Sequence, residues 1–300
     1  MKKIKKAKTL TSDRMFDIFN YTFLAILLVI VAYPLYYVLI ASISDPYEVY
    51  AGKTFLLPSK VTFEGYARVF KEKSIATGYI NSIYYTVLGT VVSVALIITT
   101  GYCVSKKTLP FRKSIMMFYV FTMYFNGGLI PTYLVVAKMG LLNSVWSLIL
   151  PGGVAVFNVI VCRTFFESSI PEELYEAASI DGSSNLRTFF RIALPLSKPI
   201  LAVMVIFTMV AYWNDWFTAL IYMSEKSKYP LQLALRQILI QSQATATMMG
   251  NMDGGYAEAN KITELIKFSS IVVGAVPMLI AYPFVQKYFE KGFMAGAVKG

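Results

Sequence analysis

The sequence predicts an all-α membrane protein with six transmembrane helices, and three observations lead to this fold class. Of the 300 residues, 56% are hydrophobic and only 15% are charged, and the mean hydropathy is +0.57. Soluble globular domains carry about 25% charged residues. The apolar residues gather in six blocks that approach or exceed the roughly 20 residues a helix needs to cross the hydrocarbon layer. A transmembrane β-barrel would instead show alternating segments of about 10 residues.

The six predicted spans form a single transmembrane domain over residues 1–300. They comprise residues 18–44, 79–105, 114–137, 141–165, 199–223 and 268–287. The first block is too long for a signal peptide, and we interpret it as a retained span. The fifth block is interrupted by one acidic residue, Asp215.

The distribution of basic residues predicts that both termini lie in the cytoplasm (N-in/C-in). In this orientation 17 of the 28 lysines and arginines fall in inner segments and 11 in outer segments. Such an excess on the cytoplasmic side is the usual bias of multispanning proteins. The net charge of +11 therefore reflects the inner loops rather than binding to nucleic acid.

Several classes of chemistry are excluded by the residues that the chain lacks. It contains no histidine, which rules out a His-ligated metal site and a Ser-His-Asp triad. Cys103 and Cys162 lie in apolar blocks and lack the spacing of a zinc or redox site. No Gly-x-x-x-x-Gly-Lys-Ser/Thr phosphate loop occurs. We expect no catalytic residue, no metal site and no cofactor in this chain.

The inner segment 167–198 carries dense helix signals. Ser169 and Pro171 suit the start of a first helix, and Gly182 suits its end. Ser183 or Ser184 can then cap a second helix, from Asn185 to Leu194, which Pro195 ends. Two such helices at the membrane surface cannot bury both of their apolar faces alone. A cytosolic partner and packing on the chain's own helix ends both remain open.

The same segment carries a family motif. Glu176-Ala177-Ala178 is followed after three residues by Gly182, and after nine more by Ile192, one residue and Leu194-Pro195. This pattern resembles the EAA motif of permease subunits of binding-protein-dependent ABC importers (type I, MetI-like fold), and it lies between predicted spans four and five. The segments around 126–131, 212–216 and 295–300 are similar to the carbohydrate branch, including the MalG-type subunit of maltose systems.

The resemblance implies that segment 167–198 is a cytoplasmic coupling helix-turn-helix that docks on an ATPase subunit. The implied coupling residues are Glu176, Ala177, Ala178, Asp181, Gly182, Leu194 and Pro195. It also implies partners: a second, homologous permease subunit, two ATPase subunits that hold ATP and Mg, and an extracytoplasmic binding protein that delivers a saccharide. The chain itself is then not an enzyme, and its place is the bacterial plasma (inner) membrane. Related C-terminal tails, here 287–300, insert between the ATPase subunits.

Polar and aromatic residues inside the spans are candidates for lining the substrate path, because aromatic faces stack on sugars and amides and carboxylates bind hydroxyl groups. An ionisable residue in a span is functional by default, which makes Asp215 the first of them. The candidates are Trp213, Asn214, Asp215, Trp216, Asn81, Tyr84, Tyr85 and Asn126, with Tyr124 and Asn158 of lower rank. An interfacial tryptophan belt beside a snorkelling Asp215 is the rival interpretation.

Three other functions are alternatives to a saccharide importer. A permease of the same fold for a non-sugar solute would carry the same motif. An ion-coupled secondary transporter usually shows internal repeats and charged midplane segments, and no repeat is found here. A membrane-embedded enzyme would need a cluster of reactive groups in the spans. The outer segment 224–267 is expected to be a long loop, which either reaches into the binding protein or is simply mobile.

Overall fold

The computed structural model describes residues 11–58, 60–249 and 256–297. Its regular elements in these ranges are helices, with one isolated β-bridge between Ser44 and Val61. The chain divides into two compact units, Met1–Val69 with Leu239–Val273, and Phe70–Ile238 with Gly274–Gly300. The predicted all-helical fold class is confirmed.

The first unit contains α1 (Thr11–Ser42), α2 (Pro46–Tyr50) and most of α3 (Glu64–Lys71), together with the C-terminal part of α14 (Leu231–Met249) and the N-terminal part of α15 (Tyr256–Ala297). In α15 the ring of Phe268 meets Tyr37 of α1 edge-on at 6.0 Å. The side chains of α1 from Met15 to Val31 are largely exposed. An apolar helix of this kind is stable where lipid covers it, because all its backbone hydrogen bonds are internal.

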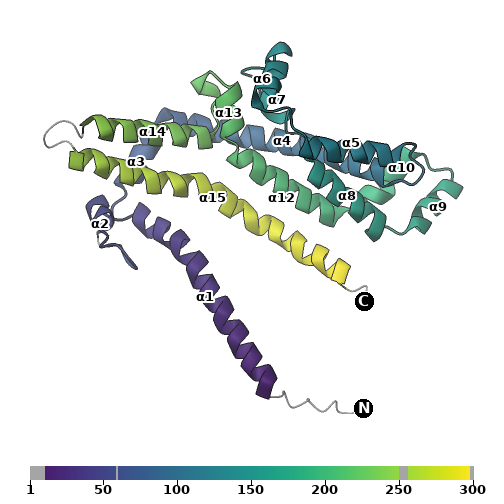
Figure 1. Cartoon of the computed structure of the whole chain (residues 1–300), viewed down its shortest axis with the longest axis horizontal. Helices are drawn as coiled ribbons and strands as arrows, with labels where there is room; N and C mark the ends of the chain where they lie inside the picture. The colour runs from purple at the N-terminus through teal and green to yellow at the C-terminus, as the bar shows by residue number, and fades with distance from the viewer. Residues whose placement is uncertain (1–10, 59, 250–255, 298–300) are drawn as a thin grey trace. The chain divides into compact units, whose positions relative to one another are not determined.

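The second unit is built on α4 (Lys73–Ser105), which packs along α8 (Val156–Ser169) and α12 (Lys198–Asn214) (Figure 1). Glycine permits the close approach of these helices. A Cβ on Gly101 would lie 2.6 Å from the Cβ of Cys162, and one on Gly89 would lie 2.8 Å from the Tyr212 ring. The side chains between the three helices form a continuous apolar core. The fully buried members from the three helices include Ile97, Val159 and Met204.

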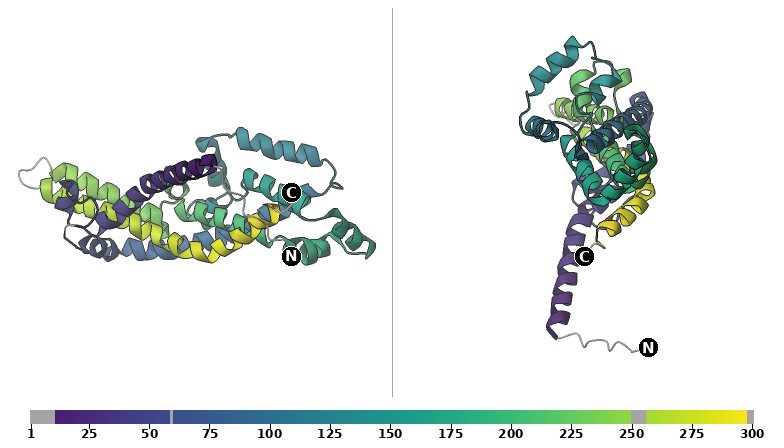
Figure 2. Two further views of the ribbon diagram at one scale, coloured as in Figure 1. Left: turned by 90° about the horizontal axis from the view of Figure 1, so that it is seen from below. Right: turned by 90° about the vertical axis from the view of Figure 1, so that its right-hand side faces the viewer.

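Three helices, α1, α4 and α15, are each long and apolar enough to cross a membrane among the residues described. Each of the other three predicted spans is divided into two helices. Residues 114–137 form α5 (Arg112–Tyr124) and α6 (Leu129–Lys138), which are bent by 113° (Figure 2). Gly128 makes the break with φ +92°, and its N–H donates to Asn126 Oδ1 at 2.8 Å.

The fourth and fifth predicted spans are interrupted as well. Residues 141–165 hold α7 (Val145–Ile149) and the first part of α8, separated by a segment that contains Pro151-Gly152-Gly153. Residues 199–223 hold α12 and α13 (Phe217–Tyr222), separated at Asp215. Proline, and adjacent glycines, weaken a helix because proline lacks the N–H donor and glycine loses more backbone entropy on folding.

Segment 224–267, predicted to be a long outer loop, is mostly helical. It contains η2 (Lys226–Lys228), α14 and the start of α15, while residues 250–255 lie outside the described residues. Leu231, Leu233 and Leu235 of α14 are buried, so the start of this helix is enclosed on more than one side. The basic N-terminal segment 1–8 is also outside the described residues, and α15 continues through the predicted tail as far as Ala297.

Candidate functional site

The segment after α8 folds as the predicted helix-turn-helix. It consists of α9 (Glu172–Ile180), α10 (Asn185–Thr188), the π-helical η1 (Phe189–Ala193) and α11 (Leu194–Leu196). Gly182 makes the turn with φ +70°. Ser184 caps the second helix, where its Oγ accepts a hydrogen bond from the Arg187 N–H.

Two details differ from the prediction. Ser169 ends α8 instead of capping α9, whose N-cap position is occupied by Pro171. Pro195 does not end the second helix, because it lies in the first turn of α11, where a missing N–H costs nothing. The chain then bends by 81° at Ser197, where α12 begins.

The inner face of the helix-turn-helix packs on the ends of α4 and α8 (Figure 1). Ala178, Phe189 and Ala193 are buried. The Phe189 ring lies 4.8 Å from the ring of Tyr102 in α4, and Tyr102 in turn lies 5.4 Å from Phe166 in α8. The small side chain of Ala178 lets α9 come close to its neighbours.

The outer face of the same segment is apolar and exposed. Ile180 is 86% exposed, Leu186 72% and Phe190 60%. Glu176 and Ala177 are exposed too, as are Asp181, which ends α9, and Pro195, while Leu194 is half-buried. Exposed apolar patches of this kind mark interaction sites, and the described residues leave this outer face uncovered.

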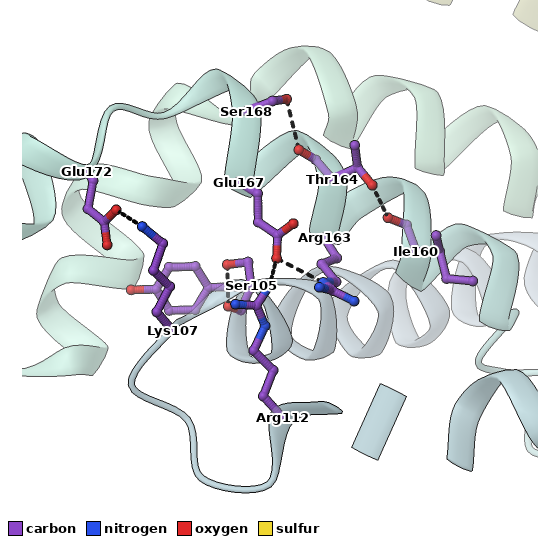
Figure 3. A network of polar contacts seen from close by, with 10 residues as sticks. Ser105, Lys107, Arg112, Ile160, Arg163, Thr164, Glu167, Ser168 and Glu172 are labelled. Atoms are coloured by element: carbon purple, nitrogen blue, oxygen red, sulfur yellow. Dashed lines mark hydrogen bonds and ion pairs between the residues drawn. The ribbon is translucent and has the colours of Figure 1, made fainter. Parts of the chain in front are cut away.

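Ion pairs join the surrounding helix ends (Figure 3). Glu167 of α8 lies between Arg112, at the start of α5, and Arg163, whose Nε is 2.9 Å from the carboxylate. Lys107 pairs with Glu172, the first residue of α9. Pairs as exposed as Lys107 and Glu172 are worth at most about 1 kcal/mol, so they orient the helix ends more than they stabilise them.

Lys106 lies against two aromatic rings just beyond the end of α4. Its Nζ is 2.7 Å from the ring centroid of Tyr175 in α9 and 4.6 Å from that of Tyr102. Burial lowers the pKa of Lys106 to about 8, and the charge of Glu172 acts in the opposite direction. Burial raises the pKa of Tyr175 to about 12, with Tyr102 as a second cause, so this phenol stays neutral. At pH 7 roughly nine-tenths of Lys106 is protonated.

We expect the rate of Lys106 acetylation, followed by mass spectrometry, to rise with pH around a midpoint near 8. This pKa is below the ordinary 10.5, so the unfolded chain binds more protons at Lys106 than the folded chain does. The free energy of unfolding therefore increases as pH rises from about 8 to about 10.5. In Glu172→Gln the midpoint should fall further, since the charge that raises the pKa is gone. A midpoint near 10.5 in the wild type would contradict the burial of this amine.

A cavity of about 470 Å³ lies in the same unit, between α4, α12, α13 and the segment that joins α7 to α8. Its polar lining comprises Ser93, Asn158, Thr208, Tyr212, Asn214, Asp215 and Thr218. The Tyr212 hydroxyl is 2.8 Å from Ser93 Oγ, which joins α12 to α4. Asp215 Oδ1 accepts a hydrogen bond from the Thr218 N–H at 3.0 Å and so caps α13.

Of the eight leading substrate-path candidates, Asn214 and Asp215 line this cavity. Trp213 is 2% exposed and donates from Nε1 to the Gly274 carbonyl at 2.9 Å. The guanidinium of Arg236 lies over the ring of Trp216, with its Cζ 3.6 Å from the centroid of that ring.

The remaining candidates contact other parts of the chain and do not line the cavity. Asn81 donates to the carbonyls of Ser227 and Tyr229, and Tyr85 donates to that of Lys228. The other two candidates differ in role: exposed Tyr84 packs on Tyr85, and Asn126 holds the break between α5 and α6.

Four further polar lining residues, Ser93, Thr208, Tyr212 and Thr218, were missed by sequence reasoning. Thr208 and Tyr212 are four residues apart and share a face of α12. That spacing was the one available signal, but it does not distinguish a cavity wall from a packed helix face.

A bundle of apolar helices with a polar cavity and a helix-turn-helix that presents an unpaired apolar face defines a multi-pass membrane transport component. The family model of the binding-protein-dependent transport system inner membrane component matches residues 109–294. The chain belongs to this family. The predicted family and the predicted inner-membrane location are therefore confirmed.

Relatives cover nearly the whole chain. The polygalacturonan/rhamnogalacturonan transport system permease protein of Bacillus subtilis (strain 168) is 40% identical over 288 residues, which cover 96% of this chain and 99% of the relative. The maltodextrin transport system permease protein of the same strain is 25% identical over 97% of this chain and 99% of its own length. The crystal structure of a bacterial ABC transporter involved in importing the acidic polysaccharide alginate includes a chain that matches with a TM-score of 0.80 and 33% identity, over 95% and 100% of the two chains.

Proposed function

We propose that this chain is one permease subunit of an ATP-driven importer of saccharides that an extracytoplasmic binding protein delivers. The observation that carries the proposal is the exposed outer face of the helix-turn-helix, formed by Ile180, Leu186 and Phe190. Its inner face is already packed on α4 and α8, so the outer face is free to bind an ATPase subunit. Relatives that are sugar permeases by name support the same assignment.

The proposed assembly contains this chain, a second homologous permease subunit and two ATPase subunits that hold ATP and Mg. The chain then forms one transmembrane permease domain with six spans and both termini in the cytoplasm. The bent pair α5 and α6 serves as the third span, and α7 with α8 as the fourth. The fifth is α12 continued by α13. This chain supplies no hydrolytic residue of its own.

Within the coupling segment the residues take different roles. Glu176, exposed on α9, pairs with a basic residue of the ATPase, and Ala177 lets that surface come close. Ala178 faces inward, and Asp181 with Gly182 forms the turn. Leu194 and Pro195 lead into the 81° bend at α12, so that a push on the segment reaches a helix that lines the cavity.

We infer further that the substrates are acidic saccharides. Two of the matching proteins transport polygalacturonan or rhamnogalacturonan and alginate by name. In this chain the Arg236 guanidinium lies over Trp216. Among the described residues, no carboxylate forms an ion pair with Arg236. Asp215 and Phe217, on either side of Trp216, line the cavity. A cation on an aromatic ring beside the path suits a sugar that carries a carboxylate.

Arg236→Gln should lower ATP-driven uptake of an oligogalacturonate about tenfold and leave a neutral malto-oligosaccharide unaffected, because a charge-assisted hydrogen bond is worth about 1.5–3 kcal/mol. Uptake of both sugars into vesicles with the complete transporter measures the difference. Arg236→Lys, which keeps the charge, is the matched control. An equal loss for both sugars would contradict the acidic substrate class.

Reconstitution of the four-subunit complex with its binding protein tests the function itself. The proposal predicts uptake that requires ATP and the binding protein. Uptake that follows an ion gradient without ATP would favour a secondary transporter. ATP-driven uptake of a non-sugar solute alone would leave the transporter class in place and overturn the saccharide assignment.

A further inference from the structure

One face of α9 is fixed to the end of α4 by a cluster of three side chains. Tyr175 of α9 and Tyr102 of α4 have ring centroids 6.2 Å apart, and the ammonium of Lys106 lies over both rings. We call Tyr102, Lys106 and Tyr175 the aromatic clasp.

The aromatic clasp joins the core through Tyr102, and its other two members are partly exposed. Tyr102 is 7% exposed and packs on Phe166 and Phe189, while Tyr175 and Lys106 are half-buried. The Tyr175 hydroxyl is buried and has no hydrogen-bond partner in the described part of the chain. The ring of Tyr175, and not its hydroxyl, therefore makes the contact. A cation–π contact is stronger when water is excluded from it.

The position of α9 makes this contact mechanically important. The helix lies between the extended joint Ile170–Pro171, where Ile170 is buried in the core, and the left-handed turn at Gly182. The exposed ion pair of Lys107 with Glu172 is screened by solvent and holds it weakly. Together with the buried Ala178, the aromatic clasp attaches the body of α9, and it does so directly to α4.

A continuous helix leads from the aromatic clasp to the cavity. Ser93 lies nine residues before Tyr102 in α4, a distance of about 14 Å along the helix axis. Ser93 lines the cavity and is hydrogen-bonded to Tyr212 of α12, which lines it as well. A displacement of α9 that is passed to the end of α4 therefore reaches two walls of the cavity.

We propose that Tyr102, Lys106 and Tyr175 are positioning residues that transmit the movement of the coupling segment to α4, in parallel with the backbone route through α11 into α12. This inference rests on the proposed function as an ATP-driven permease. It predicts that breaking the aromatic clasp leaves ATP hydrolysis running while less solute moves for each ATP.

The experiment uses the complete transporter in vesicles and measures solute taken up per ATP hydrolysed. Lys106→Met and Tyr175→Leu should lower this ratio roughly tenfold, the scale of a desolvated cation–π contact, with the ATPase rate retained. Lys106→Arg and Tyr175→Phe should keep the wild-type ratio, since a cation and a ring remain. Lys107→Met, which removes only the exposed ion pair, is the matched control.

The double variant Lys106→Met/Tyr175→Leu should be no worse than either single variant, because each one already breaks the same contact. Wild-type uptake per ATP in both single variants would contradict the transmitting role of the aromatic clasp. Losses that add in the double variant would contradict it as well. Absence of ATP-driven uptake in the wild type would overturn the proposed function instead, so the two failures are distinguishable.

Discussion

Replacing Glu176 by lysine is expected to lower ATP-driven uptake by roughly a hundredfold or more, while the chain still reaches the membrane. Glu176 is exposed on α9 beside Ala177, on the face that the chain leaves uncovered. In a docked complex this carboxylate loses its water and needs a basic partner. Losing one member of such a pair costs about 2–5 kcal/mol, and reversal of the charge adds repulsion.

The measurement is uptake by reconstituted vesicles, together with the amount of ATPase that co-purifies with the chain. Glu225→Lys is the control, because Glu225 is an exposed carboxylate outside the coupling segment, next to η2. Normal uptake and normal ATPase retention by Glu176→Lys would contradict a docking role for α9.

The second large effect is expected from Gly101→Val, which should reduce the yield of folded protein severely and lower its Tm. A Cβ at this position would lie 2.6 Å from the Cβ of Cys162 and 3.3 Å from the backbone nitrogen of Arg163. The helices α4 and α8 would have to separate along their packed core. Overpacking of this kind typically costs 1–3 kcal/mol, a large part of the marginal stability of a protein.

Thermal unfolding in detergent and elution in size-exclusion chromatography measure this effect. Gly152→Val is the matched control, because a Cβ on Gly152 meets no atom within 4 Å. An unchanged Tm for Gly101→Val would mean that the contact between α4 and α8 is looser than the structure has it.

The helical fold and the helix-turn-helix were predictable because their signals are local. Long apolar runs specify membrane helices, and Ser184 and Gly182 mark helix ends by their own backbone chemistry. The breaks between helices at Gly128 and Asp215 were not predicted, although Asn126-Gly127-Gly128 is a turn signal in its own right. The prediction of the spans rested on the length of the apolar blocks, which does not show a short break within a block.

The candidate site was predictable only in part, because only some of its residues are close together in the sequence. The proposed coupling residues lie in one short segment, so one sequence pattern contains all of them. The cavity is lined by Ser93, Asn158 and Tyr212 from three different helices, which only tertiary packing brings together. Trp213, a leading candidate for the path, instead donates to Gly274, a partner 61 residues away in sequence.

In the proposed assembly the exposed face of the helix-turn-helix binds an ATPase subunit. A photo-crosslinking amino acid at Leu186, which is 72% exposed, tests this claim in the assembled transporter. Irradiation should join the chain to the ATPase from position 186, and not from Tyr124 of α5, which is 75% exposed. Crosslinks from position 186 that reach only lipid or the other permease subunit would contradict the account.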